Sequence, residues 1–234
     1  NAYPALQIYS PAYQPANQEV AERRLALGPL SGDELCDFVL DHDYPLVVGI
    51  LDGVQALAEN PVESALAAKL VGALRARLLD TEGQPHDDSE DGDALFWERV
   101  FVSSPHHIQN DAVRAALADI RTWRSAPRVG TVDIVQGQTV DACLVSYGVA
   151  DAEYAEREKH FIYSAERLNV AITRARSKTI VLLPRALINP SLAVYNDEAV
   201  AFGIATMKGL VEYARQGESQ QCFELGNKVT ATFY

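Results

Sequence analysis

The chain has 234 residues, of which 48% are hydrophobic and 22% are charged, and its formal net charge is −12. This size and composition fit one large globular domain, or one domain with appendages. They exclude a membrane-spanning protein, because no apolar run approaches the roughly 20 residues that a span needs. Three widely spaced cysteines, Cys36, Cys143 and Cys222, have no metal-ligand spacing, so we expect reduced thiols in a cytoplasmic protein without a membrane partner.

The acidic charge is concentrated in the first part of the chain. Residues 1–100 hold 6 Lys or Arg against 18 Asp or Glu, whereas residues 101–234 hold 14 of each. A strongly acidic chain is unusual for a nucleic-acid-binding protein. We therefore expect any contact with nucleic acid to be local and partly made by the backbone, with other domains supplying much of the positive charge.

The chain divides into three parts. Residues 1–34, rich in Pro, Tyr and Gly, are interpreted as an irregular lead-in, and its first residues, Asn1-Ala2, fit the remnant of an expression tag on a cut-out domain. Residues 35–190 form the main domain. Within it, residues 81–93 are so acidic that we expect a mobile loop that buries little surface. Residues 191–234 are expected to be a C-terminal helical extension.

Apolar runs alternate with helical patterns along the main domain. The run at residues 46–51 is typical of a buried strand. Residues 60–79 predict a helix, because Asn60 suits its N-cap, Glu63 completes a capping box, and a Leu recurs every fourth residue from Leu66. Further strands are predicted at 100–103, 128–132, 142–147 and 179–183, with a helix from Ser104 to about Trp123, a charged insertion at 151–159 and a helix at 198–214. This alternation predicts an α/β fold with a parallel sheet flanked by helices.

The most informative stretch is residues 167–176, which read R-L-N-V-A-I-T-R-A-R. Arg167 and Arg174 are seven residues apart, so we expect them on one face of a helix, two turns apart. Ser164 is the expected N-cap, and apolar residues between the arginines would dock the helix onto the domain. Rigidly held guanidinium groups at the edge of a domain suit contact with a phosphate that another domain binds.

This stretch resembles motif VI of superfamily 1 helicases, R-L-N-V-A-[LIV]-T-R-A-[RK]. Residues 129–148, V-G-T-V-D-I-V-Q-G-Q-T-V-D-A-C-L-V-S-Y-G, are similar to motif V of that family, [ST]-V-D-x-F-Q-G-x-E before a buried strand. The pair resembles the second RecA-like motor domain of the subgroup that includes nonsense-decay and DNA-processing helicases, over roughly residues 46–184. The resemblance implies a RecA-like sheet of the P-loop NTPase type.

The resemblance also implies contacts with a nucleotide. Arg174 would be the catalytic arginine finger, which reaches across a cleft between two motor domains to the γ-phosphate of ATP. Arg167 is expected to touch the nucleotide or a carboxylate that closes the two domains, or to pair with an acid on its own surface. Gln138 and Thr139 fall where the family contacts ATP. Thr139 replaces a Glu that contacts the ribose, so we expect a weaker or altered contact there.

A second group of residues is implied to bind single-stranded nucleic acid: Thr131, Asp133, Gln136, Gly137, Ser103 and Pro105. Residues 103–109, S-S-P-H-H-I-Q, lie where the family has motif IV, T-P-Y-x-x-Q, and His106 replaces its Tyr. The hydroxyl of Thr131 can bond a phosphate, although an ordinary strand residue fits equally well. Adjacent histidines on a helix do not converge on a metal ion, so no metal site is predicted.

The sequence contains no G-x-x-x-x-G-K-[ST] phosphate-binding loop. The acidic pair Asp33-Glu34 follows no apolar strand, so we do not interpret it as a Mg²⁺ motif. We expect ATP and Mg²⁺ to be bound mainly by a first motor domain that this chain lacks, and neither to be bound by this chain alone. The expected partners are that first domain and single-stranded nucleic acid.

The sequence therefore predicts the C-terminal motor domain of an ATP-dependent superfamily 1 DNA or RNA helicase. One alternative is a degenerate, non-enzymatic RecA-like module that binds a partner or nucleic acid. Another is an unrelated doubly wound domain that binds a small ligand.

Overall fold

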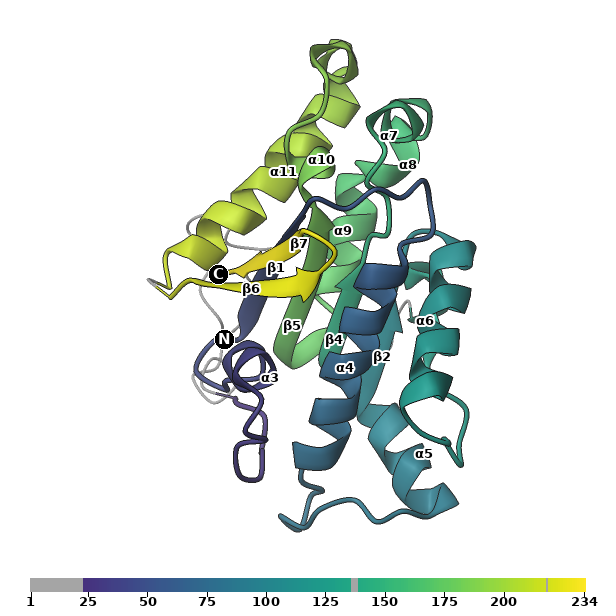
Figure 1. The fold of residues 1–234 in the computed structure, drawn as a ribbon, viewed down its shortest axis with the longest axis vertical. Helices are drawn as coiled ribbons and strands as arrows, with labels where there is room; N and C mark the ends of the chain where they lie inside the picture. Colours follow the sequence, from purple (N-terminus) through teal and green to yellow (C-terminus); the bar gives the residue numbers. More distant parts are fainter. Residues whose placement is uncertain (1–22, 136–138, 218) are drawn as a thin grey trace.

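The computed structural model describes residues 23–135, 139–217 and 219–234. They form a seven-stranded sheet with helices on both faces (Figure 1), in the strand order β3-β2-β4-β5-β1-β7-β6. The five strands from β3 to β1 are parallel, and β7 and β6 run antiparallel at one edge. This arrangement confirms the α/β, RecA-like fold expected from the sequence.

The elements have the following bounds. The strands are β1 (Leu46–Asp52), β2 (Val100–Ser103), β3 (Val129–Gly130), β4 (Val140–Ser146), β5 (Ala175–Pro184), β6 (Gln221–Gly226) and β7 (Val229–Phe233). The α-helices are α3 (Glu34–Val39), α4 (Pro61–Arg77), α5 (Glu90–Arg99), α6 (His107–Ile120), α7 (Ala152–Arg157), α8 (Lys159–Ile162), α9 (Ala165–Ile172), α10 (Arg185–Ile188) and α11 (Glu198–Arg215). Two 3₁₀ helices are η1 (Val132–Val135) and η2 (Leu192–Asn196). No helix among the described residues is long and apolar enough to cross a membrane.

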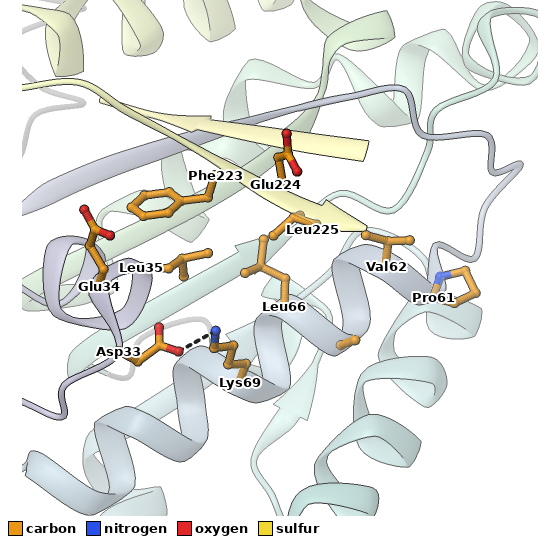
Figure 2. Close-up of a pocket in the computed structure, with 11 residues that line it drawn as sticks. Asp33, Glu34, Leu35, Pro61, Val62, Leu66, Lys69, Phe223, Glu224 and Leu225 are labelled. Carbon is orange, nitrogen blue, oxygen red and sulfur yellow. Dashed lines mark ion pairs between the residues drawn. The ribbon is translucent and has the colours of Figure 1, made fainter. Parts of the chain in front are cut away.

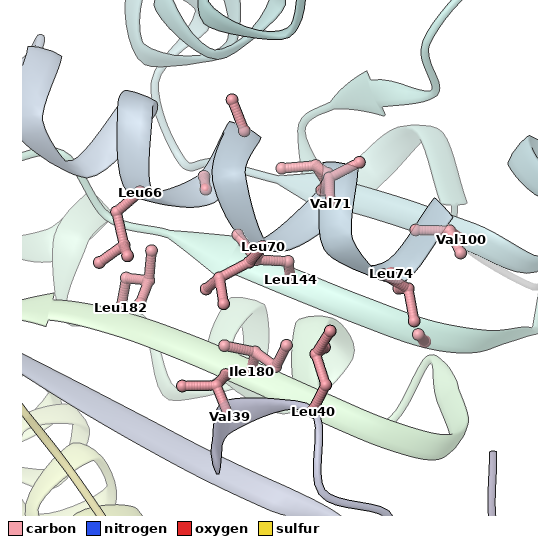
Figure 3. Packing of buried hydrophobic residues seen from close by; sticks show 14 of the residues in the cluster. Val39, Leu40, Leu66, Leu70, Val71, Leu74, Val100, Leu144, Ile180 and Leu182 are labelled. Carbon is pink, nitrogen blue, oxygen red and sulfur yellow. The ribbon is translucent and has the colours of Figure 1, made fainter. Parts of the chain in front are cut away.

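Each face of the sheet carries its own apolar core. On one face, α3, α4, α5 and α6 contribute one buried cluster, and on the other, α9 and α11 contribute a second. Figure 3 shows the first core, where Leu66, Leu70 and Leu74 of α4 lie over Leu144 of β4 and Ile180 of β5. The predicted leucine stripe of α4 is therefore confirmed as the buried face of that helix.

The start of α4 also matches its prediction. The Asn60 side chain accepts a hydrogen bond from the backbone N–H of Glu63 at 3.1 Å, and its amide donates to Glu63 Oε2 at 3.1 Å. Pro61 occupies the first helical position, where its missing N–H costs nothing. These contacts satisfy helix donors that would otherwise lack a partner.

The expected acidic loop is wrong for its last residues. The helix α5 begins at Glu90, capped by the Ser89 side chain, which accepts from the backbone N–H of Gly92. Asp93, at the end of the expected loop, is 0% exposed and accepts a hydrogen bond from Arg75 Nε at 3.0 Å. A carboxylate can be buried when a buried cation pairs with it, and the local acidic composition did not reveal that partner.

The C-terminal extension is only partly helical, which corrects the prediction of a helical segment over 191–234. The helix α11 matches the predicted helix at 198–214, but β6 and β7 then form a hairpin that extends the sheet beside β1. Asn227 and Lys228 make the turn with φ of 50° and 64°. Positive φ at both central residues is typical of the two-residue turns that match the twist of paired strands.

The pair Asp33-Glu34 has a structural role. The Asp33 side chain accepts from the backbone N–H of Cys36 and so caps α3, and it also forms an ion pair with Lys69 at 2.7 Å. These bonds lower the pKa of Asp33, with the hydrogen bond from Lys69 as the largest cause. The Asp33 carboxylate therefore stabilises the start of α3. It does not follow a strand, as the carboxylate of a Mg²⁺ motif would.

Candidate functional sites at two edges of the sheet

The parallel strands give the domain two opposite edges. At the carboxyl edge, β2, β3 and β4 end at Ser103, Gly130 and Ser146. At the amino edge, β4 and β5 begin side by side, because Val140 pairs with Ala175. The predicted site residues that the structure describes divide between these edges.

The carboxyl edge gathers five predicted residues around one small cavity. The lining includes Ser103, Pro105, Thr131, Asp133 and Arg167. The cavity volume is about 20 Å³, which is room for about one water molecule. The cavity is therefore too small to hold a nucleotide. Ser103 is 1% exposed, and its hydroxyl oxygen has no hydrogen-bond partner among the described residues. Asp133, in contrast, is exposed.

Arg167 lies at this edge in contact with a row of aromatic rings. Its guanidinium lies over the Phe161 ring, 4.0 Å from the ring centroid. The Phe161 centroid is 5.1 Å from that of His106, which in turn is 5.8 Å from that of Tyr154. The segment predicted as a charged insertion thus folds into two short helices, α7 and α8, whose aromatic rings pack beside the start of α6.

The two arginines of residues 167–176 do not share a helix face, which corrects the sequence prediction. The helix α9 ends at Ile172, and the Thr173 hydroxyl donates to the carbonyl of Asn169 at 2.7 Å. A Thr hydroxyl that bonds the preceding turn competes with helix continuation, and the buried strand β5 follows from Ala175. Arg167 lies in the first turn of α9, and Arg174 lies past its end, so they sit near opposite edges of the sheet.

Arg174 lies at the amino edge, between α9 and β5. Its Nε donates to the carbonyl of Val170 at 3.0 Å, and its own carbonyl accepts from the backbone N–H of Val140 at 2.9 Å. Thr139, the neighbour of Val140, is exposed at this same edge. The predicted residues Gln136, Gly137 and Gln138 lie outside the described residues.

A buried polar network behind the carboxyl edge escaped the sequence analysis. Glu63 Oε1 accepts from the Ser146 hydroxyl at 2.8 Å and from the backbone N–H of Gly148 at 3.0 Å. Gln109 donates to the Ser146 hydroxyl at 2.8 Å and accepts from the backbone N–H of Asn60 at 2.8 Å. Gly148 has φ of 76°, and a Cβ there would lie 2.7 Å from the Gln109 side chain. The network therefore fixes the loop after β4 relative to α4 and α6.

Two residues of this network stand out in the sequence, but the sequence relates each of them only to its neighbours in the chain. Glu63 was identified as part of a capping box, and Gln109 as the match to the last residue of motif IV. Their meeting at Ser146 joins positions that are 83 and 37 residues apart in the chain. The parallel pairing of β2 with β4 and the packing of α4 against α6 bring them together.

The pKa of Glu63 predicts a pH dependence of stability. Burial raises this pKa from 4.5 to about 7, although the hydrogen bonds from Ser146 and Gly148 oppose the shift. Between pH 4.5 and 7 the folded state binds the proton more tightly than the unfolded state. We therefore expect the contribution of Glu63 to the free energy of unfolding to fall as pH rises through this window.

Urea unfolding of the wild type and of Glu63→Gln, from pH 5 to pH 8, measures this contribution. The difference between the two proteins should change with pH up to about pH 7 and then level off. Exposed Glu98→Gln makes the same change at the surface and is the matched control. A difference for Glu63→Gln that varies with pH no more than that of the control would contradict the raised pKa. Taking differences cancels the titration of His86 and His106, whose pKa values burial lowers.

The adjacent histidines lie at the N-terminal end of α6. His106 precedes α6 without a capping hydrogen bond from its side chain, and His107 is exposed. Across residues 23–135, 139–217 and 219–234, no group of three or more His, Cys, Asp or Glu side chains is placed to hold a metal ion.

The fold and the two edges define a RecA-like α/β domain whose predicted site residues lie near the ends of its strands. Comparison with protein families identifies it further: the chain belongs to the AAA domain family, whose model matches residues 52–185. This segment runs from the last residue of β1 to the first residue of α10 and contains both helicase-like stretches. Proteins of the superfamily 1 helicase type contain this domain, so the chain carries a helicase-like NTPase domain. Comparison with curated proteins gave no match.

Proposed function

We propose that this chain is the C-terminal, second RecA-like motor domain of an ATP-dependent superfamily 1 helicase acting on DNA or RNA. In this proposal a first motor domain binds ATP and Mg²⁺, and the present domain supplies Arg174 and part of the path for a single strand. The observation that carries the proposal is the separation of the candidate residues: Arg174 and Thr139 lie at the amino edge, and Ser103 and Thr131 lie at the carboxyl edge.

The contacts of Arg174 suit an arginine finger. Its backbone is tied to the first residue of β4, whereas its side chain donates to the Val170 carbonyl near the C-terminal end of α9. A bond from guanidinium to a neutral carbonyl is weaker than a charge-assisted bond to phosphate. A γ-phosphate can therefore compete with the Val170 carbonyl for the Arg174 side chain, while the backbone of Arg174 stays bonded to Val140 of β4. At that position its charge would stabilise the transition state of phosphoryl transfer.

The residues present fit a supporting contact with ATP and not a complete site. The sequence has no phosphate-binding loop and no lysine of that motif, so the β- and γ-phosphates and Mg²⁺ must be held by another domain. At the amino edge, Arg174 would approach the terminal phosphate, and Thr139 would lie close to the nucleotide.

The carboxyl edge is the proposed path for the single strand. Ligands of open α/β sheets bind where parallel strands end. The buried hydroxyl of Ser103 and the partly exposed Thr131 lie there, together with Arg167. Because Arg167 lies in the first turn of α9, away from Arg174, we now assign it to the nucleic acid rather than to ATP.

A non-enzymatic module is the second candidate. The exposed Thr139, in place of the Glu that the resemblance expects, favours it. The two candidates differ in whether Arg174 affects turnover once a domain with a phosphate-binding loop is present.

The purified chain alone should hydrolyse no ATP above background. The reason is that nothing in its sequence cradles the β- and γ-phosphates. Phosphate release by the chain, compared with an Arg174→Ala control, measures this. Turnover by the chain that Arg174→Ala abolishes would mean that it carries a complete site, and the half-motor proposal would then be wrong.

The isolated chain should bind single strands weakly, with a Kd above about 10⁻⁴ M at physiological salt. Residues 1–100 carry an excess of 12 acidic residues, and repulsion from them should limit binding. Few phosphates should be contacted, so the dependence of affinity on salt should be shallow. Fluorescence anisotropy of a labelled oligonucleotide over a salt series tests this. Tight binding with a steep salt dependence would instead indicate an autonomous nucleic-acid-binding module.

A further inference from the structure

A groove separate from the carboxyl edge and the amino edge lies between the hairpin of β6 and β7 and the helices α3 and α4 (Figure 2). Its volume is about 630 Å³. The apolar part of its lining comes from Leu35 of α3, Val62 and Leu66 of α4, and Phe223 and Leu225 of β6. A groove of this size is large enough for several side chains of a bound segment.

One wall of the groove is an unpaired strand. Within the described part of the chain, β6 pairs only with β7, so its other edge presents backbone N–H and C=O groups without strand partners. Such an edge is a template for an added strand. Along β6 the side chains alternate, with Phe223 and Leu225 half-buried and Glu224 exposed between them.

The charges at the groove are mostly negative. Among the described residues that line the groove, Lys69 is the only cation, and it forms an ion pair with Asp33 at 2.7 Å, which Figure 2 marks. Glu34 and Glu224 are both exposed, and neither has an ion-pair partner among the described residues. In a strand added to β6, a side chain opposite Glu224 would be stabilised if basic and destabilised if acidic.

We propose that β6 binds an extended segment of a partner protein in which basic and apolar side chains alternate. The segment adds an eighth strand to the sheet. Its apolar side chains face the same way as Phe223 and Leu225, over Val62 and Leu66, and its Lys or Arg side chains lie beside Glu224. The backbone hydrogen bonds give affinity, and the alternation gives specificity.

The negative charge at the groove argues against two other occupants of it. A second copy of this chain would bring a second Glu224 to the same edge and would join two molecules that each carry a net charge of −12. The N-terminal residues 1–22 of this chain contain two Glu, three Pro and no Lys or Arg. They therefore lack the positive charge, and Pro cannot donate a backbone hydrogen bond to a strand.

The first experiment uses labelled peptides and the 234-residue chain. The probe is a peptide of about eight residues that alternates Lys or Arg with Val or Ile, slightly longer than β6. Fluorescence anisotropy should show saturable binding with a Kd below about 1 mM. A peptide with Glu at each basic position should not bind, and N-methylation of alternate backbone amides should weaken binding about tenfold or more. Equal binding of the basic and N-methylated peptides would contradict the proposal that the peptide adds a strand to β6.

The second experiment uses matched charge reversals. Glu224→Lys should weaken binding of the basic peptide about fivefold, which is the loss of an exposed ion pair and its replacement by repulsion. Glu82→Lys makes the same change at an exposed turn outside the groove and should leave the affinity unchanged within about twofold. Equal effects of both variants would show attraction to net charge alone and would overturn the site. Sedimentation that shows dimers, displaced by the peptide, would overturn the choice of a basic partner in favour of a second copy.

Discussion

Replacing Arg174 with Ala should lower ATP turnover by the complete motor about 100-fold or more while leaving its affinity for ATP nearly unchanged. The complete motor here is this domain together with its proposed first motor domain. An arginine finger acts on charge that develops only during phosphoryl transfer, so its loss raises the barrier without weakening ground-state binding. Steady-state turnover and equilibrium nucleotide binding, measured on the same preparation, separate the two effects.

Arg176→Ala is the matched control for this measurement. Arg176 is only two residues away, but it is exposed and lies 3.8 Å from the carboxylate of Asp141. Losing a long, exposed ion pair should change turnover by less than about fivefold. A loss of ATP affinity in Arg174→Ala with an unchanged kcat would remove Arg174 from catalysis. No change in either quantity would favour the non-enzymatic module.

Asp93→Asn should lower the free energy of unfolding by about 3 kcal/mol or more, because it leaves Arg75 as a buried and unpaired charge. Asp93 is 0% exposed and the Arg75 side chain is 4% exposed. Asp93 also accepts from the backbone N–H of Arg124 at 2.8 Å. The change from Asp to Asn keeps the shape, so a large loss would report charge and not a cavity. Urea unfolding at neutral pH measures it.

Asp111→Asn provides the comparison at the surface. Asp111 pairs with Arg114 at 2.6 Å, but its side chain is 72% exposed, so its loss should cost less than about 1 kcal/mol. The double variant Arg75→Met/Asp93→Leu buries no charge and should recover part of the stability lost in Asp93→Asn. If Asp93→Asn costs no more than Asp111→Asn, the buried pair does not stabilise the fold as we expect.

Local sequence patterns were sufficient for elements whose stability is local. The capping box of Asn60 and Glu63 and the leucine repeat both act within one helix, so α4 could be predicted closely. The apolar runs that became β1, β2, β4 and β5 were visible because strands buried on both faces are continuously apolar. The α/β fold with a parallel sheet then followed from their alternation with helices, and its RecA-like type followed from the resemblance to motifs V and VI.

The errors arose where long-range contacts decide the structure. Asp93 appeared to be part of a solvated loop because its partner, Arg75, is 18 residues away in the chain. The hairpin at the C-terminus depends on the pairing of β7 with β1, which no local pattern reveals. The division of site residues between two edges depends on the direction of each strand. A motif that names Arg167 and Arg174 together cannot show that they lie at opposite ends of α9.

The helix α9 is a stiff connection between the two proposed ligand contacts. A helix of eight residues is about 12 Å long and stiff along its axis, and one proposed ligand contact lies at each end of it. A nucleotide that draws the Arg174 side chain away from the Val170 carbonyl would remove one bond to the last turn of α9. A shift of the helix along its axis in response would move Arg167 against the ring of Phe161. The nucleotide would then change the affinity of the domain for a single strand bound at Arg167. By thermodynamic linkage, that strand must change the affinity for the nucleotide by the same factor. Lengthening or kinking α9 should uncouple the two binding events while leaving each one intact.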